Sequence, residues 1–212
     1  MYIIRKNEDF PPVEFASKDG LLAIGGDLSV KRLIDAYNRG IFPWYDATQP
    51  VLWWSPDPRM VLFPKKLKVS KSMRQVLKKG NYQVSYNKAF AEVLQNCASV
   101  ERKGQFGTWL TEEMKEAYLR LHQLGFTISV EVWEDDALVG GLYGIYLKEK
   151  QVFCGESMFT RKSNASKFGF IHLVRKLGAA GVKLIDCQVY TKHLASQGAE
   201  EIPREEFLKF LK

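Results

Sequence analysis

The sequence has little of what disulfide scaffolds and metal sites require. Its 212 residues include three cysteines, an odd number with no Cys-x-x-Cys spacing. Three histidines, His122, His172 and His193, are scattered without the spacing of metal ligands, and we interpret them as surface or capping residues. We therefore expect no disulfide, no metal site and no cofactor.

Long apolar runs are also missing. The longest, such as Val139 to Leu147, fall well short of the roughly 20 residues that a membrane-spanning helix needs. The first basic residues are followed at once by Asn7, Glu8 and Asp9, which is not the pattern of a secretory signal peptide. We expect a cytoplasmic protein.

Acidic residues are scarce in one segment. The net charge is +7, and residues 61–110 hold ten Lys or Arg against two Asp or Glu, whereas the flanking segments are close to balanced. A helix predicted after Ser70 would carry basic residues on one face and apolar residues on another. A merely soluble helix face usually carries both signs, so this segment is typical of an anion-binding surface. Nucleic acid is expected to bind it through Lys65, Lys66, Lys68, Lys71, Arg74, Lys78 and Lys79.

What the chain does contain predicts an α+β protein in two parts. Residues 1–60 are dense in Pro, Gly and aromatic residues, which favours a small loop-rich N-terminal lobe. One short helix is predicted there from Val30 to Arg39, capped by Ser29. Residues 61–212 alternate predicted helices and strands and should form a larger domain around a mixed sheet.

The predicted strands of the larger domain come one after another. Ile128 to Trp133, Ala137 to Leu147 and Gln151 to Phe159 should be antiparallel neighbours. Three glycines in the second strand indicate burial on both faces or close approach of another backbone. A helix from Ala165 to Ala180 then leads, by a right-handed crossover, to a strand from Val182 to Val189.

Three polar side chains interrupt these apolar strands. A bulge at Gly155 would place Glu156 on the same side as Phe153 and Met158. Asp186 and Gln188 have the same parity in the next strand and should project from one face. Each acid alone is more often a hydrogen-bonded structural group. Two carboxylates and a carboxamide on adjacent strands can, however, hold a cation and orient an amine.

A series of blocks in fixed order resembles the bacterial leucyl/phenylalanyl-tRNA–protein transferases from about residue 10 to the C-terminus. The blocks are Phe10–Pro12, Gly20–Ser29, Gly40–Trp44, Trp53–Arg59, Gly107–Trp109, Ser129–Trp133, Gly140–Gly144, Gly155–Phe159, Asn164–Lys167, Leu184–Gln188 and Ser196–Ala199. The resemblance implies a GNAT-like fold for residues 61–212. It also implies transfer of Leu or Phe, and weakly Met, from aminoacyl-tRNA to proteins with N-terminal Arg or Lys, which marks them for degradation.

The same resemblance implies where the aminoacyl group lies. An apolar pocket at the domain junction would have a polar floor of Glu156, Asp186 and Gln188. Its walls would be Trp44, with Trp53 and Trp54 as alternatives, Trp109, Phe153, Met158 and Ile185.

The polar floor suggests a mechanism without a covalent nucleophile. Gln188 would accept a hydrogen bond from the attacking amine, and Asp186 would polarise or deprotonate that amine or, instead, anchor the basic side chain of the acceptor. Cys187 is a poor nucleophile candidate, because nothing nearby would lower the pKa of its thiol.

Two other functions compete with this one. A CoA-dependent acyltransferase would need a glycine-rich turn to hold the pyrophosphate, and Phe159 to Phe168 contains no glycine. A tRNA-binding module without catalysis would explain the basic segment but would leave Glu156, Asp186 and Gln188 unexplained.

Overall fold

The N-terminal lobe is built on a small four-stranded sheet. The computed structural model describes residues 2–100 and 110–212. The strand order in this sheet is β1-β2-β4-β3, with β1 parallel to β2 and the other pairs antiparallel. The elements are β1 (Tyr2–Ile4), η1 (Val13–Phe15), β2 (Leu21–Gly25), α1 (Val30–Asn38), β3 (Phe42–Pro43) and β4 (Leu52–Trp54). The predicted helix is confirmed as α1, and its cap Ser29 accepts a hydrogen bond from the backbone N–H of Arg32. The sequence does not predict the strands, which are too short to show a period of two.

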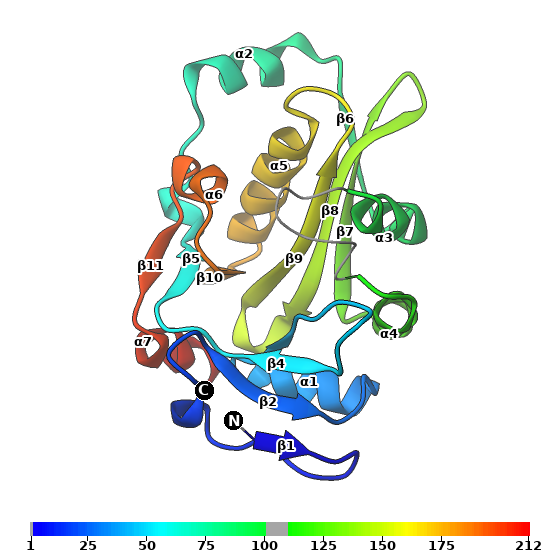
Figure 1. The fold of residues 1–212 in the computed structure, drawn as a ribbon. Coiled ribbons are helices and arrows are strands. Elements are labelled where there is room, and N and C mark those ends of the chain that lie inside the picture. Colours follow the sequence, from blue (N-terminus) through cyan, green and yellow to red (C-terminus); the bar gives the residue numbers. More distant parts are fainter. Residues whose placement is uncertain (1, 101–109) are drawn as a thin grey trace.

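The larger domain surrounds a seven-stranded sheet of order β11-β5-β10-β9-β8-β7-β6 (Figure 1). Of its neighbouring pairs, β9 and β10 run parallel and the rest antiparallel. Its strands are β5 (Arg59–Leu62), β6 (Gln83–Tyr86), β7 (Thr127–Glu134), β8 (Ala137–Leu147), β9 (Val152–Thr160), β10 (Leu184–Gln188) and β11 (Glu200–Ile202). Its helices are η2 (Pro64–Lys66), α2 (Lys71–Lys79), α3 (Phe90–Ala98), α4 (Glu112–Gln123), η3 (Lys148–Lys150), α5 (Ala165–Ala179), α6 (Lys192–Ser196), α7 (Arg204–Leu208) and η4 (Lys209–Leu211).

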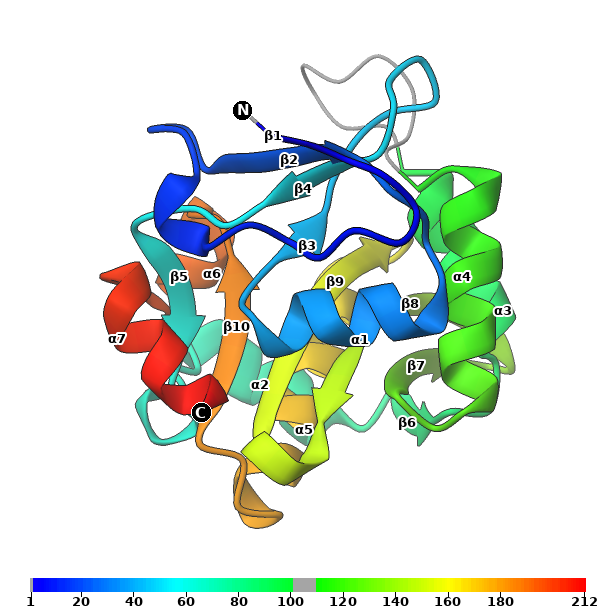
Figure 2. The same ribbon diagram turned by 90° about the horizontal axis from the view of Figure 1, so that it is seen from below.

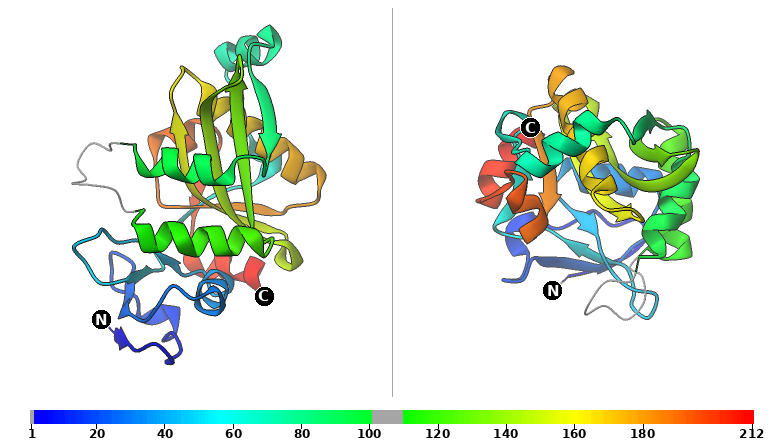
Figure 3. Two further views of the ribbon diagram at one scale, coloured as in Figure 1. Left: turned by 90° about the vertical axis from the view of Figure 1, so that its right-hand side faces the viewer. Right: turned by 90° about the horizontal axis from the view of Figure 1, so that it is seen from above.

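Helices cover both faces of the large sheet. The long helix α5 packs on β7, β8 and β9 from one side, and α2 lies against α5. On the other side, α3 and α4 pack on the sheet, and α1 reaches β8 from the N-terminal lobe (Figure 3). The N-terminal lobe lies at the end of the sheet where β8 ends and β9 begins, so one apolar core includes Leu33 of α1, Tyr118 of α4 and Leu147 of β8 (Figure 2).

These observations confirm the predicted α+β class, the antiparallel β7–β9 run and the crossover from β9 through α5 to a parallel β10. They also confirm Ser70 as the cap of α2, because its hydroxyl accepts from the backbone N–H of Met73. The division at residue 60 stays a prediction.

Two glycines of β8 allow close approaches that shape the site. A Cβ atom at Gly144 would lie 2.2 Å from the carbonyl oxygen of Cys154, and one at Gly140 would lie 2.7 Å from the Cβ of Ala165. Gly144 therefore permits the irregular pairing of β8 with β9, and Gly140 permits the start of α5 to rest directly on β8.

Candidate active site

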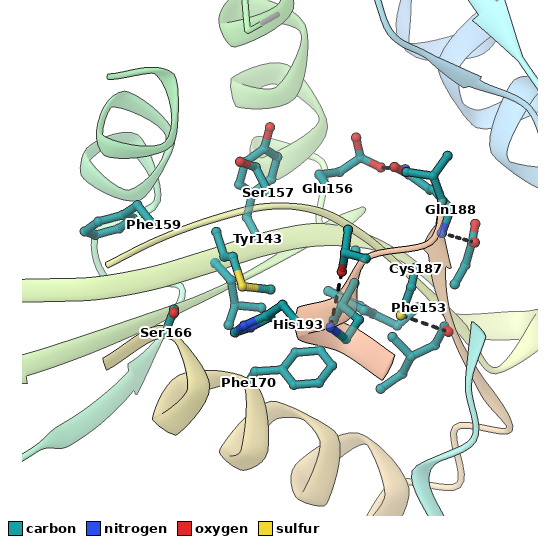
Figure 4. Close-up of a pocket in the computed structure, with 18 of the residues that line it drawn as sticks. Tyr143, Phe153, Glu156, Ser157, Phe159, Ser166, Phe170, Cys187, Gln188 and His193 are labelled. Atoms are coloured by element: carbon teal, nitrogen blue, oxygen red, sulfur yellow. Dashed lines mark hydrogen bonds between the residues drawn. The ribbon is translucent and has the colours of Figure 1, made fainter. Parts of the chain in front are cut away.

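A cavity of about 540 Å³ opens where the two parallel strands separate (Figure 4). The pairing of β9 with β10 covers Val152 to Cys154 and Leu184 to Asp186, and beyond these residues the two strands diverge. Residues from both diverging ends, from the start of α5 and from the loop after β3 line the cavity. The parallel pair thus supplies backbone rigidity directly behind an open site.

The expected bulge in β9 is confirmed. Tyr143 pairs with Ser157 and the next residue of β8, Gly144, pairs with Gly155, so Glu156 is the extra residue. The bulge restarts the alternation, and as a result Phe153, Glu156 and Met158 all line the cavity.

The regular alternation expected for β10 ends at Asp186. The register against β5 shifts between Asp186 and Gln188, and Gln188 has a left-handed backbone with φ of 65°. The Asp186 side chain turns to Arg59 of β5, whereas the Gln188 side chain turns to Glu156. The expectation that Asp186 and Gln188 project from one face, because they are two residues apart in a strand, is therefore wrong, although both residues line the cavity.

Asp186 forms a buried, two-pronged ion pair with Arg59. Nε and Nη2 of Arg59 donate to Oδ1 and Oδ2 of Asp186 at 2.8 and 2.6 Å, and both side chains are 1% exposed. Oδ1 also accepts from the backbone N–H of Gln188 at 2.9 Å. The guanidinium donates further to the carbonyl of Gly40 and lies against the rings of Phe42 and Phe207. The sequence analysis missed Arg59, although an arginine in the apolar strand Arg59–Leu62 requires a buried partner.

Glu156 ends a chain of hydrogen bonds that comes from two helices. Its Oε2 accepts from the hydroxyl of Tyr118 at 2.6 Å, and that hydroxyl lies 2.8 Å from the hydroxyl of Tyr37. Its Oε1 accepts from Nε2 of Gln188 at 3.0 Å. Burial raises the pKa of Glu156 to about 7, against the lowering effect of the two tyrosine hydroxyls. Burial also raises the pKa values of both tyrosines, so they remain donors.

The predicted apolar walls surround the cavity as far as the described residues reach. Trp44, Phe153, Met158 and Ile185 all line it, together with Phe170 of α5, which the sequence analysis missed. The two alternatives to Trp44 lie elsewhere. The side chain of Trp53 is in the core, and Trp54 donates from Nε1 to the carbonyl of Trp44. Trp109 lies outside the described residues.

Two side chains at the start of α5 and on α6 also belong to the wall. Ser166 and His193 line the cavity on the side away from Gln188 (Figure 4). The interpretation of His193 as a surface or capping residue is thus wrong, since its spacing in the sequence gave no indication of the α6 turn that brings it here. Burial raises the pKa of the Cys187 thiol, which agrees with its exclusion as a nucleophile.

The seven predicted tRNA-binding residues lie together but not in the cavity. Lys65 and Lys66 belong to η2, Lys68 follows it, and Lys71, Arg74, Lys78 and Lys79 belong to α2; all seven are exposed. Lys66 pairs with Glu200. The helix buries Met73 against α5 and leaves its basic residues in solvent.

Within residues 2–100 and 110–212, no helix is both long and apolar enough to cross a membrane.

The fold and the site define an α+β protein whose apolar cavity ends in hydrogen-bonding side chains, which is suited to hold an acyl group beside an incoming amine. Family comparison then specifies the class. The family model for leucyl/phenylalanyl-tRNA protein transferase matches residues 61–212, and the model for the N-terminal domain of that transferase matches residues 26–57. The chain belongs to this family of aminoacyltransferases.

Individual relatives agree with this membership. The chain is 65% identical to a leucyl/phenylalanyl-tRNA–protein transferase of Christiangramia forsetii and 56% identical to one of Flavobacterium psychrophilum, in both cases over 100% of each chain. A solved GCN5-related N-acetyltransferase from Kribbella flavida is similar at a TM-score of 0.41 and 9% identity, over 79% of this chain and 59% of that one. The solved C-terminal domain of a putative lysylphosphatidylglycerol synthetase from Agrobacterium fabrum is similar at a TM-score of 0.43 and 10% identity, over 79% of this chain and 53% of that one.

Proposed function

We propose that this chain transfers leucine or phenylalanine, and methionine weakly, from aminoacyl-tRNA to the N-terminal Arg or Lys of acceptor proteins in the cytoplasm, which marks them for degradation. Family membership supports the aminoacyl-tRNA and protein substrates. The observation that carries the proposal is the hydrogen-bonded pair of Glu156 and Gln188 at the end of an apolar cavity.

The apolar walls would bind the side chain of the donor amino acid. Phe153, Met158, Phe170 and Ile185 present hydrocarbon, aromatic and thioether surface to the cavity. Such a surface gains free energy from burying a Leu or Phe side chain and gives no partner to a charged one.

Gln188 would orient the attacking amine. Its Nε2 already donates to Glu156, which leaves its Oε1 to accept a hydrogen bond from the α-amine of the acceptor. Holding the amine beside the ester carbonyl supplies much of the rate, since proximity alone is worth about 7–11 kcal/mol in favourable cases.

Glu156 is the better placed of the two carboxylates to receive the proton of that amine. Asp186 already binds a guanidinium, that of Arg59, and the backbone N–H of Gln188, which favours a positioning role through Gln188 over direct contact. In the described wall of the cavity, Glu156 is the carboxylate without a cationic partner. The amine nitrogen forms a bond to the ester carbon, Glu156 takes one amine proton, and the bond from that carbon to the ribose oxygen breaks. The ribose oxygen leaves with the proton returned by Glu156.

The test is single-turnover transfer from Phe-tRNA to a peptide with N-terminal Arg. Glu156→Gln and Gln188→Ala should each slow the chemical step by about 10²–10⁴-fold, the usual loss when acid–base groups are removed. The exposed Glu149 of η3 provides the matched control, Glu149→Gln, which should transfer at the wild-type rate.

Peptide concentration separates catalysis from acceptor anchoring. If Glu156 only anchors the basic side chain of the acceptor, saturating peptide restores the rate of Glu156→Gln. A slow rate at saturating peptide supports proton transfer. Near-normal rates in both site variants would contradict the proposed site.

A further inference from the structure

The start of α5 forms a second polar end of the cavity, distinct from the end at Glu156 and Gln188. Thr160, Ser166 and His193 line it. Figure 4 shows Ser166 at the head of its helix, with His193 and Phe170 between it and the Gln188 side of the view. The mechanism above uses none of these polar groups.

Ser166 is a buried polar side chain that faces the cavity without a partner. It is 7% exposed, and its hydroxyl makes no hydrogen bond among the described residues. Its backbone N–H reaches only Oγ1 of Thr160, at 3.5 Å. Nε2 of His193 is also buried and has no partner within the described residues. Both residues line this end of the cavity, and each has a polar atom to which a ligand could hydrogen-bond.

The first turn of α5 adds hydrogen-bond donors of its own. The helix is 15 residues long, and Asn164 at its N-cap makes no side-chain capping bond. The N–H of Ala165 donates to the carbonyl of Lys162, whereas that of Ser166 has only its long contact with Thr160. The weakly bonded N–H of Ser166 and the positive end of the helix dipole therefore favour a negative charge at this point.

The basic side chains around this end have the same positive sign as the N-terminal end of the helix dipole. Lys167 lies in the first turn and is close enough to His193 that, together with burial, it lowers the pKa of that histidine. Arg161 is exposed just before the helix, while Lys162 is paired with Glu134. The two carboxylates of the described cavity wall, Glu156 and Asp186, belong to the other end. Basic side chains thus lie near the Ser166 end of the cavity, and the carboxylates lie at the other end.

We propose that the start of α5, with Ser166, His193 and Lys167, binds the phosphate of the 3′-terminal nucleotide of the donor tRNA. This inference rests on the proposed function. A terminal nucleotide that carries an aminoacyl ester has a phosphate on one side and the reacting ester on the other, which matches the two ends of the cavity. Helix N-termini with hydroxyl and cationic side chains are common phosphate sites.

Strand geometry and the basic helix agree with this placement. Thr160 follows Glu156 by four positions along β9, on the order of 13 Å of extended chain, and side chains from both ends shorten that gap. α2 packs against α5 and carries the exposed basic residues outside. The tRNA would approach along α2, pass the start of α5 and place its terminal adenosine in the cavity.

The experiment measures Kd by calorimetry for two stable analogues. Both carry phenylalanine in amide linkage at the 3′ position of adenosine, and only one carries a 5′-phosphate. The wild-type enzyme should bind the phosphorylated analogue about tenfold or more tightly, as expected for charge-assisted hydrogen bonds. Ser166→Ala, His193→Ala and Lys167→Met should each reduce that ratio and leave the Kd of the unphosphorylated analogue nearly unchanged.

Matched substitutions close to these positions serve as controls. Ser163→Ala, three residues earlier in an exposed position, and His172→Ala, a part-buried histidine of α5 that contacts Phe168, should keep the wild-type ratio. Equal affinity of the wild type for both analogues overturns the phosphate site and leaves the proposed function standing. If neither analogue binds, the proposed function and the phosphate site both fail.

Discussion

Glu156 accepts hydrogen bonds from Tyr118 and Gln188, which carry no formal charge, so its ionisation is governed by burial. Because its pKa is raised to about 7, it loses the ability to accept a proton as the pH falls through that value. Single-turnover transfer measured from pH 5.5 to 8.5 should show an acidic limb near pH 7. The limb should be missing from the slow residual rate of Glu156→Gln, and its persistence there would assign it to another group.

The same carboxylate links folding stability to pH. The folded pKa of about 7 lies above the unfolded value of 4.5, so the native state keeps its proton over a range where the unfolded state has lost it. Wild-type stability from this group therefore falls as the pH rises from about 4.5 to 7. When the pH is raised from 5 to 8, the free energy of urea unfolding of Glu156→Gln should increase relative to that of the wild type by at most about 3 kcal/mol. A constant difference would contradict the raised pKa.

Met158 tests the donor pocket. It is partly buried against the cluster that contains Phe153 and Ile185. Met158→Ala enlarges the pocket and should raise the Phe-to-Leu preference or reduce transfer of both, because one side chain in an apolar pocket discriminates by only about 1–3 kcal/mol. Competition between Leu-tRNA and Phe-tRNA measures the ratio. Efficient wild-type transfer of Asp or Lys would contradict an apolar pocket.

At the scale of elements, the pair of Arg59 and Asp186 joins β5 to β10 and, through the carbonyl of Gly40, to the N-terminal lobe. Asp186→Asn leaves the buried guanidinium without a counter-charge and should destabilise the fold by about 3–5 kcal/mol. It should also slow transfer while nearly sparing tRNA affinity, because the pair holds the β10 turn that carries Gln188.

A double variant separates the cost of an unpaired charge from the value of the pair. Arg59→Met with Asp186→Leu removes both charges, so denaturation should show it more stable than Asp186→Asn. If the losses in unfolding free energy from the two single substitutions simply add in the double variant, the ion pair does not couple the strands.

Part of this arrangement is predictable from the sequence. Apolar runs bounded by turn residues predict β7, β8 and β9, a helical segment after Asn164 predicts α5, and Gly155 beside an isolated acid predicts the bulge. The direction of the Gln188 side chain is not predictable, because a left-handed residue at a strand end breaks the parity on which the expectation relied. The Tyr37–Tyr118 contact joins positions 81 residues apart, and only packing of the lobes brings the two hydroxyls together.

At the scale of the whole molecule, the excess positive charge is separated from the chemistry. The exposed basic residues of α2 lie outside the cavity, so tRNA affinity and the chemical step should respond to different substitutions. Replacing Lys71, Arg74 and Lys78 together by Ala should weaken tRNA binding and flatten its dependence on salt. Each lost phosphate contact removes about 0.7–0.9 from the slope of log K against log salt.

The matched control replaces three basic residues remote from α2, Lys148, Lys183 and Lys212, which should leave the slope unchanged because none belongs to the basic segment. A second measurement removes the body of the tRNA. With phenylalanyl-adenosine as donor, the α2 variant should transfer at the wild-type rate, since the cavity and Glu156 are intact and the substrate has no distant phosphates for α2 to bind. An unchanged salt slope would exclude α2 from the tRNA surface. A loss of rate with phenylalanyl-adenosine would show that α2 supports the cavity through α5, against which it packs.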